Sequence, residues 1–168
     1  AESGEQMREL WELRGEMARA FESYDPGLTP LTAGDVTVPI GEFSELMSQI
    51  AALEADRDVL IPCFGHAGDG NVHYVVMVDA DDPDAREHGE QVYGEIVETA
   101  VERGGTVTGE HGIGIGKRSY VGEEWGDETV TLMRQLKQTF DPNGILNPGK
   151  IFPEGTDAAD KDRIDETE

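Results

Sequence analysis

Residues 59–78 read Val59-Leu60-Ile61-Pro62-Cys63-Phe64-Gly65-His66-Ala67-Gly68-Asp69-Gly70-Asn71-Val72-His73-Tyr74-Val75-Val76-Met77-Val78, and the architecture follows from this stretch. Its two apolar runs, 59–64 and 72–78, have the length of buried strands. Between them, Asp69-Gly70 is a favoured two-residue hairpin turn. Such a turn would pair 68 with 71, 67 with 72 and His66 with His73, with the histidine Cβ atoms about 4.5–5.5 Å apart. A wider loop would still bring the two imidazoles together.

Helices are predicted on both sides of this hairpin. Apolar residues at helical spacing indicate four of them, over Gly4 to Ser23, Gly41 to Glu54, Asp84 to Arg103 and Asp127 to Phe140. Two further short strands are expected at 35–39 and 106–108, and residues 25–34 are expected to form a loop. This irregular alternation indicates an α+β fold, an antiparallel sheet with helices packed on one face.

The chain is strongly acidic. Among its 168 residues, 13 are Lys or Arg and 36 are Asp or Glu, which gives a net charge of −23. Nucleic acid and anionic membranes would be repelled, so neither is expected as a partner. Disorder and a salt-adapted surface are the two alternatives for such acidity. The clear apolar periodicity favours a folded, halophilic protein, while residues 154–168, acidic and without aromatics, are expected to be a disordered tail.

Cysteine content and hydropathy indicate the cellular compartment in which the protein is expected. Cys63 is the single cysteine, so an intrachain disulfide is excluded. No stretch approaches the roughly 20 apolar residues of a membrane span, and the N-terminus has no signal-peptide pattern. A cytoplasmic location is therefore expected.

A second motif lies in the glycine-rich segment 109–117, where Glu110 and His111 are adjacent. Together with His66 and His73, Glu110 could complete a metal site of two histidines and one carboxylate, leaving coordination positions open. His111 could then act as a general base beside the metal. The alternatives are two unrelated histidines at a polar turn and a flexible surface loop. The segment matches neither a Walker A loop nor GxGxxG, so a phosphate cradle is disfavoured.

The segments 65–73, 104–114 and 141–150 together resemble the C-terminal domain of FAD-linked oxidases, the group of D-lactate dehydrogenases, glycolate oxidase flavin subunits and D-2-hydroxyglutarate dehydrogenases. The resemblance implies part of a ferredoxin-like fold over residues 1–153. It also implies that His66, His73 and Glu110 bind zinc or manganese and that His111 takes the proton of the substrate hydroxyl. Arg14 matches the position that holds the substrate carboxylate.

Asn71, Asn147 and Lys150 match positions at which the family lines the flavin and substrate cleft. The implied reaction oxidises the α-hydroxyl of a D-2-hydroxy acid to a 2-oxo acid, with hydride transfer to FAD. The implied partners are an FAD-binding domain that is absent from this chain, an electron acceptor such as an iron–sulfur protein or a quinone, and a second copy in a homodimer. A place at the periphery of the respiratory membrane is compatible with such an acceptor.

Two departures from the family pattern bear on the substrate. Ala33 and Val75 stand where the 2-hydroxyglutarate enzymes carry Lys and Asn, which favours D-lactate or glycolate over a dicarboxylate. The chain is expected to be an N-terminally truncated domain that is inactive alone. A stand-alone metal-binding module, a truncated paralogue without activity, a flavoenzyme cap for another alcohol and a metal-dependent hydrolase are the alternatives.

Overall fold

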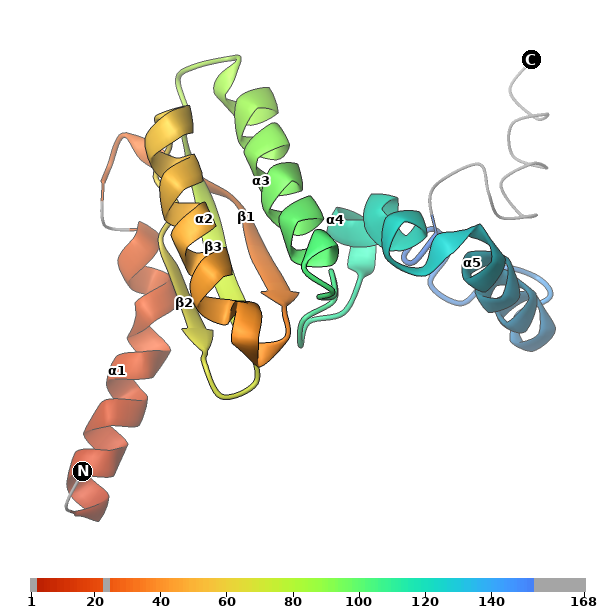
Figure 1. The fold of residues 1–168 in the computed structure, drawn as a ribbon, viewed down its shortest axis with the longest axis horizontal. Coiled ribbons are helices and arrows are strands. Elements are labelled where there is room, and N and C mark those ends of the chain that lie inside the picture. Colours follow the sequence, from red (N-terminus) through yellow and green to blue (C-terminus); the bar gives the residue numbers. More distant parts are fainter. Residues whose placement is uncertain (1–2, 23–24, 153–168) are drawn as a thin grey trace.

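Three antiparallel strands form the centre of the molecule, in the order β1–β3–β2 (Figure 1). The strands are β1 (Leu28–Thr37), β2 (Cys63–His66) and β3 (Asn71–Asp79). The structure is a computed structural model that describes residues 3–22 and 25–152. β3 is buried along nearly its whole length, as its continuous apolar run predicts for a strand with a neighbour on each edge.

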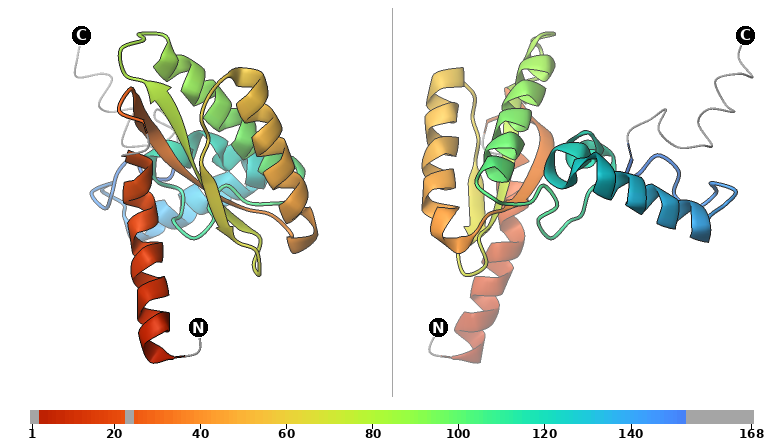
Figure 2. Two further views of the ribbon diagram at one scale, coloured as in Figure 1. Left: turned by 90° about the vertical axis from the view of Figure 1, so that its left-hand side faces the viewer. Right: turned by 45° about the vertical axis from the view of Figure 1, so that its right-hand side comes forward.

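Two helices, α2 (Phe43–Arg57) and α3 (Ala85–Glu102), lie side by side on one face of this sheet (Figures 1 and 2). Their buried residues recur at helical spacing: Leu46 and Ile50 in α2; Val92, Ile96, Val97 and Ala100 in α3. These side chains form the core with the side chains of β1 and β3 that face the helices, Val36, Val72, Tyr74 and Val76. The predicted α+β class, with helices packed on one face, is confirmed.

The order β1–α2–β2–β3–α3 is part of a ferredoxin-like arrangement, as the family resemblance implies. A fourth strand would lie at the free edge of β1. There Thr106 forms a single bridge with Thr37, through N–H···O bonds of 2.8 and 3.2 Å. The strand predicted at 106–108 is thus reduced to one bridge, because the chain turns away at Gly109, whose φ is +45°.

Two strand boundaries differ from the predictions. β1 begins at Leu28, inside the stretch 25–34 that the sequence predicted to be a loop. β3 supplies it with partners from Leu28↔Asp79 onward, and an irregularity between Pro30 and Thr32 accommodates the proline, which has no N–H to donate. β2 is shorter than the predicted 59–64 strand and begins at Cys63.

The remaining helices lie outside the sheet layer. α1 (Gly4–Glu22) and α5 (Val121–Phe140) project from it in different directions (Figures 1 and 2). Gly126, at φ +71°, interrupts α5, so its second part begins where the sequence predicted the helix to begin. Within residues 3–22 and 25–152, no helix combines the length and apolar character needed to cross a bilayer. The acidic tail, 154–168, lies outside the described residues.

Candidate active site

The β2–β3 hairpin brings His66 and His73 together, in a register that differs from the prediction. His66 lies opposite Asn71, and His73 lies opposite Phe64. The turn is longer than two residues because the His66 carbonyl accepts N–H bonds from both Asp69 (3.0 Å) and Gly70 (3.1 Å). The direct pairing of the histidines was therefore wrong. They are diagonal neighbours on one face of the sheet, with ring centroids 5.1 Å apart.

Contact with the end of β1 fixes this turn. The Gly70 carbonyl accepts a hydrogen bond of 3.0 Å from the Val38 N–H. Gly70 has φ +78°, and a Cβ there would lie 1.9 Å from the Val38 carbonyl oxygen. Only glycine permits this approach without displacing the backbone.

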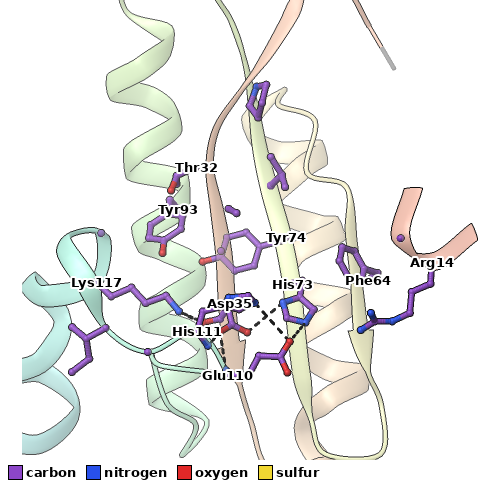
Figure 3. Close-up of a pocket in the computed structure, with 18 residues that line it drawn as sticks. Arg14, Thr32, Asp35, Phe64, His73, Tyr74, Tyr93, Glu110, His111 and Lys117 are labelled. Atoms are coloured by element: carbon purple, nitrogen blue, oxygen red, sulfur yellow. Dashed lines mark hydrogen bonds and ion pairs between the residues drawn. The ribbon is translucent and has the colours of Figure 1, made fainter. Parts of the chain in front are cut away.

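Glu110 reaches the histidines from a separate loop. Its Oε1 atom lies 3.2 Å from His73 Nε2 and 3.7 Å from His111 Nε2 (Figure 3). The same atom lies 3.7 Å from His66 Nε2. Two ligands of a tetrahedral Zn²⁺ lie about 3.3 Å apart when each bond is 2.0–2.1 Å. The spacing of these donor atoms therefore suits a small divalent cation.

Two observations on single atoms agree with this. The buried Nε2 of His66 has no hydrogen-bond partner among the described residues, so this nitrogen is available to a cation. Burial lowers the pKa of His73, against the opposing effects of the Asp35 and Glu110 carboxylates. A neutral imidazole is the form that binds a metal. His66, His73 and Glu110 thus form a group whose spacing fits a cation.

Asp35 is a site residue that the sequence reasoning missed. It is 3% exposed and lies opposite His73 in the β1–β3 register. Its Oδ2 accepts N–H bonds of 2.8 Å from both Glu110 and His111, while its Oδ1 lies 3.4 Å from His73 Nδ1. The available signal was the alternation of 35–38, which places Asp35 on the face opposite Val36 and Val38, away from the helices.

Lys117 was also missed. It is 5% exposed, its Nζ donates to the Asp35 backbone carbonyl, and it lies 3.8 Å from Asp35 Oδ2. Burial lowers the pKa of Lys117, whereas Asp35 opposes that change. A buried lysine needs such a partner. In the sequence, Lys117 is only the last residue of a glycine-rich segment, and no local signal indicates its burial.

A cavity of about 770 Å³ is lined by Asp35, His73, Glu110, His111 and Lys117, and also by Tyr93 of α3 (Figure 3). Arg14 points into it from α1, with its guanidinium carbon 5.4 Å from the Trp11 ring centroid. Beyond the histidines the wall is mostly apolar. Ala33 and Val75, which are paired across β1 and β3, and Phe64 contribute to it.

The three positions predicted to line the flavin cleft do not lie in this cavity. Asn71 is buried at the end of β3, where its Oδ1 accepts a 3.3 Å bond from the Thr37 hydroxyl. Asn147 and Lys150 are exposed in the segment that follows α5. Their contact with a flavin stays a prediction.

Comparison with known proteins identifies relatives of this arrangement. Residues 1–151 match the family model described as "FAD linked oxidases, C-terminal domain". A mitochondrial D-lactate dehydrogenase [cytochrome] of Arabidopsis thaliana is 38% identical over 153 residues, covering 91% of this chain and 27% of that protein. The glycolate oxidase subunit GlcD of Bacillus subtilis (strain 168) is 45% identical over 118 residues, covering 70% of this chain and 25% of that protein. The chain thus spans about a quarter of the length of these relatives.

A solved structure of similar fold is the 4-ethylphenol oxidase from Gulosibacter chungangensis in its isoeugenol complex. The TM-score is 0.58 at 21% sequence identity, over 92% of this chain and 32% of the other. At that identity the likeness concerns the fold alone.

Proposed function

We propose that this chain, which belongs to the C-terminal domain family of FAD linked oxidases, forms the substrate side of an FAD-dependent D-2-hydroxy acid dehydrogenase. One observation carries the proposal: three imidazoles converge on Glu110 Oε1 at the edge of a cavity that Arg14 also enters. The named activities of the relatives, D-lactate dehydrogenase and glycolate oxidase subunit, are compatible with it.

His66, His73 and Glu110 would hold the cation, because their donor atoms lie within 4.8 Å of one another. Imidazole and carboxylate ligands suit Zn²⁺ or Mn²⁺. When bound, such a cation would act as a Lewis acid on the α-hydroxyl, and FAD, held mainly by another domain, would supply the hydride acceptor.

The proton of the hydroxyl would go to His111 Nε2. This imidazole is 68% exposed and faces the cavity beside Glu110, so it can approach a substrate without losing a buried contact. Arg14 would hold the substrate carboxylate, for which its planar guanidinium offers two parallel hydrogen bonds. His111 and Arg14 would thus position the substrate at its hydroxyl and at its carboxylate.

The apolar wall supports a monocarboxylate substrate. Ala33, Val75 and Phe64 offer no charge to a second carboxylate, and Lys117 is already paired with Asp35. A carboxylate buried without a partner is strongly disfavoured. We therefore propose D-lactate or glycolate, both of which place hydrogen or a methyl group against this wall.

The test is oxidation by the protein that carries this chain together with its FAD-binding domain, with an artificial electron acceptor. We expect turnover of D-lactate or glycolate and little of D-2-hydroxyglutarate. His111→Gln should lower kcat by about 10²-fold or more. His88→Gln is the matched control, because His88 contacts the Arg57 carbonyl far from the cavity. The proposal fails if none of the 2-hydroxy acids is oxidised, or if the two variants behave alike.

A stand-alone metal-binding module is a second candidate, because this chain supplies all the proposed ligands itself. The metal content of the purified chain in high salt, compared with that of His73→Ala, tests the site. Metal in the parent that is lost in the variant, without any hydroxy acid oxidation by the full protein, would favour the module.

The projecting helices α1 and α5 carry exposed apolar side chains that a partner would cover. Leu10, Trp11 and Leu13 of α1, with Leu136 and Phe140 of α5, are more than half exposed. Apolar surface of this kind favours burial against another domain or subunit. An FAD-binding domain or a second copy of the chain would provide that cover, and size-exclusion chromatography in high salt would separate monomer from dimer.

A further inference from the structure

The two oxygens of the Asp35 carboxylate contact different parts of the site. Oδ1 lies 3.4 Å from His73 Nδ1, and this buried atom has no hydrogen-bond partner among the described residues (Figure 3). Because His73 turns its other nitrogen, Nε2, toward Glu110 at 3.2 Å, the imidazole lies between two carboxylates. A hydrogen on Nδ1 would face Oδ1, at a separation longer than an ordinary hydrogen bond, and would leave the Nε2 lone pair on the side of Glu110.

The second oxygen, Oδ2, accepts the N–H groups of Glu110 and His111, each at 2.8 Å. It thereby ties the loop that carries the proposed ligand and base to the sheet. The loop can come this close because residue 109 is glycine, since a Cβ there would lie 2.3 Å from the Asp35 carboxylate. One buried side chain thus contacts three of the four site residues.

The groups around Asp35 Oδ2 are two backbone N–H donors and a lysine ammonium. Lys117 lies 3.8 Å from Oδ2, and backbone N–H groups stabilise a carboxylate anion. An anion can only accept hydrogen bonds. Because Glu110 beside Nε2 is half-exposed to water whereas Asp35 beside Nδ1 is buried, we place the hydrogen of a neutral His73 on Nδ1. Metal-binding histidines commonly donate their second nitrogen to a carboxylate in this way, which fixes the tautomer and the ring orientation.

We propose that Asp35 is the positioning residue of this site: it holds His73 as the Nδ1–H tautomer, with Nε2 free for the cation, and it anchors Glu110 and His111. This role of Asp35 depends on the proposed function in one respect only, namely that the site binds a cation. The same carboxylate also belongs to a second donor set, with His73 and His111, that could hold an ion. Because Oδ2 accepts two N–H bonds and Oδ1 faces His73 Nδ1, the nitrogen that does not face Glu110, we assign Asp35 to positioning and not to ligation.

The variant Asp35→Asn separates the role of Asp35 in holding the His73 tautomer from its role in anchoring Glu110 and His111. The asparagine carbonyl can still accept both N–H bonds, whereas its NH₂ group would face His73 Nδ1 and require a lone pair there. Histidine NMR on the ¹⁵N-labelled, metal-free chain should show Nδ1–H for His73 in the parent and Nε2–H in the variant. In a competition titration, Zn²⁺ affinity should fall about 10- to 100-fold. Asp35→Ala should also accelerate amide exchange at Glu110 and His111.

Asp141→Asn is the matched control. Asp141 is 4% exposed, accepts N–H bonds from Ile145 and Leu146 at 2.9 Å each, and is paired with Lys137. Like Asp35, it is a buried carboxylate that accepts two backbone N–H bonds and lies beside a lysine, but among the described residues it contacts none of the histidines. Its replacement should therefore leave the His73 tautomer and the Zn²⁺ affinity unchanged.

The outcomes are distinguishable. An Nε2–H tautomer in the parent chain overturns the proposal without any variant, and so does an Asp35→Asn protein with parental tautomer and affinity. If Zn²⁺ binds equally to the parent and to His66→Ala, the proposed metal site fails, while the tautomer measurement still decides the role of Asp35.

Discussion

Replacement of Gly109 by alanine tests how the site loop is held. At φ +45°, alanine costs about 1–2 kcal/mol in backbone energy. The new Cβ would also lie 2.3 Å from the carboxylate carbon and both oxygens of Asp35, so the loop or the carboxylate must move. That movement breaks two N–H···carboxylate bonds, each worth about 1.5–3 kcal/mol. We expect Gly109→Ala to lower the free energy of unfolding by about 4 kcal/mol or more.

Two other glycines of the chain provide matched controls. Gly112 has φ +78°, and a Cβ on it would have no atom within 4 Å, so Gly112→Ala should cost only the backbone energy of about 1–2 kcal/mol. Gly68 has neither a positive φ nor a neighbour within 4 Å of such a Cβ, and its replacement should have almost no effect. Urea unfolding at high KCl concentration gives the three values from the midpoints at unchanged m. Equal losses at 109 and 112 would refute the contact with Asp35.

Salt and pH provide two further tests. With a net charge of −23, the chain should lose thermal stability as KCl is lowered, because screening of its self-repulsion weakens; a Tm independent of KCl would contradict this. The pKa of Asp141 is lowered by the hydrogen bond from Lys137 and by the N–H groups of Leu146 and Ile145. Its stabilisation is therefore present above the unfolded pKa and is lost as the pH falls through the lower folded value. Asp141→Asn should be less stable than the parent at pH 7, with a difference that shrinks below about pH 4 in unfolding measurements; a difference independent of pH would refute the pairing.

The local sequence pattern was sufficient to predict much of the fold. The apolar stripe of α3 and Gly104 after it, at φ +73°, predicted both the helix and its end. The continuous run at 72–78 predicted the central strand, because only a strand buried on both faces is apolar at successive positions. The motifs around His66 and Glu110 indicated candidate metal donors, and in the structure the donor atoms of His66, His73 and Glu110 lie within 4.8 Å of one another.

Contacts between distant segments decided what local pattern could not. The start of β1 at Leu28 depends on partners in β3, since the local signals Pro30 and Gly34 favour a loop. The hairpin turn is longer than its sequence predicts, and it is held from outside the hairpin by the Val38 N–H, which donates to the Gly70 carbonyl.

Residue type and short-range spacing were enough to set the main helices and the central strand, the acidic surface and the chemical identity of the site groups, since none of these depends on distant partners. Folding in three dimensions was needed to place Asp35 opposite His73, to bury Lys117 beside it and to shape the cavity that Arg14 enters. These features arise because the pairing of β1 with β3 and the return of the glycine-rich loop join residues about 40 to 80 positions apart. Local periodicity carries no information about which distant side chains will meet.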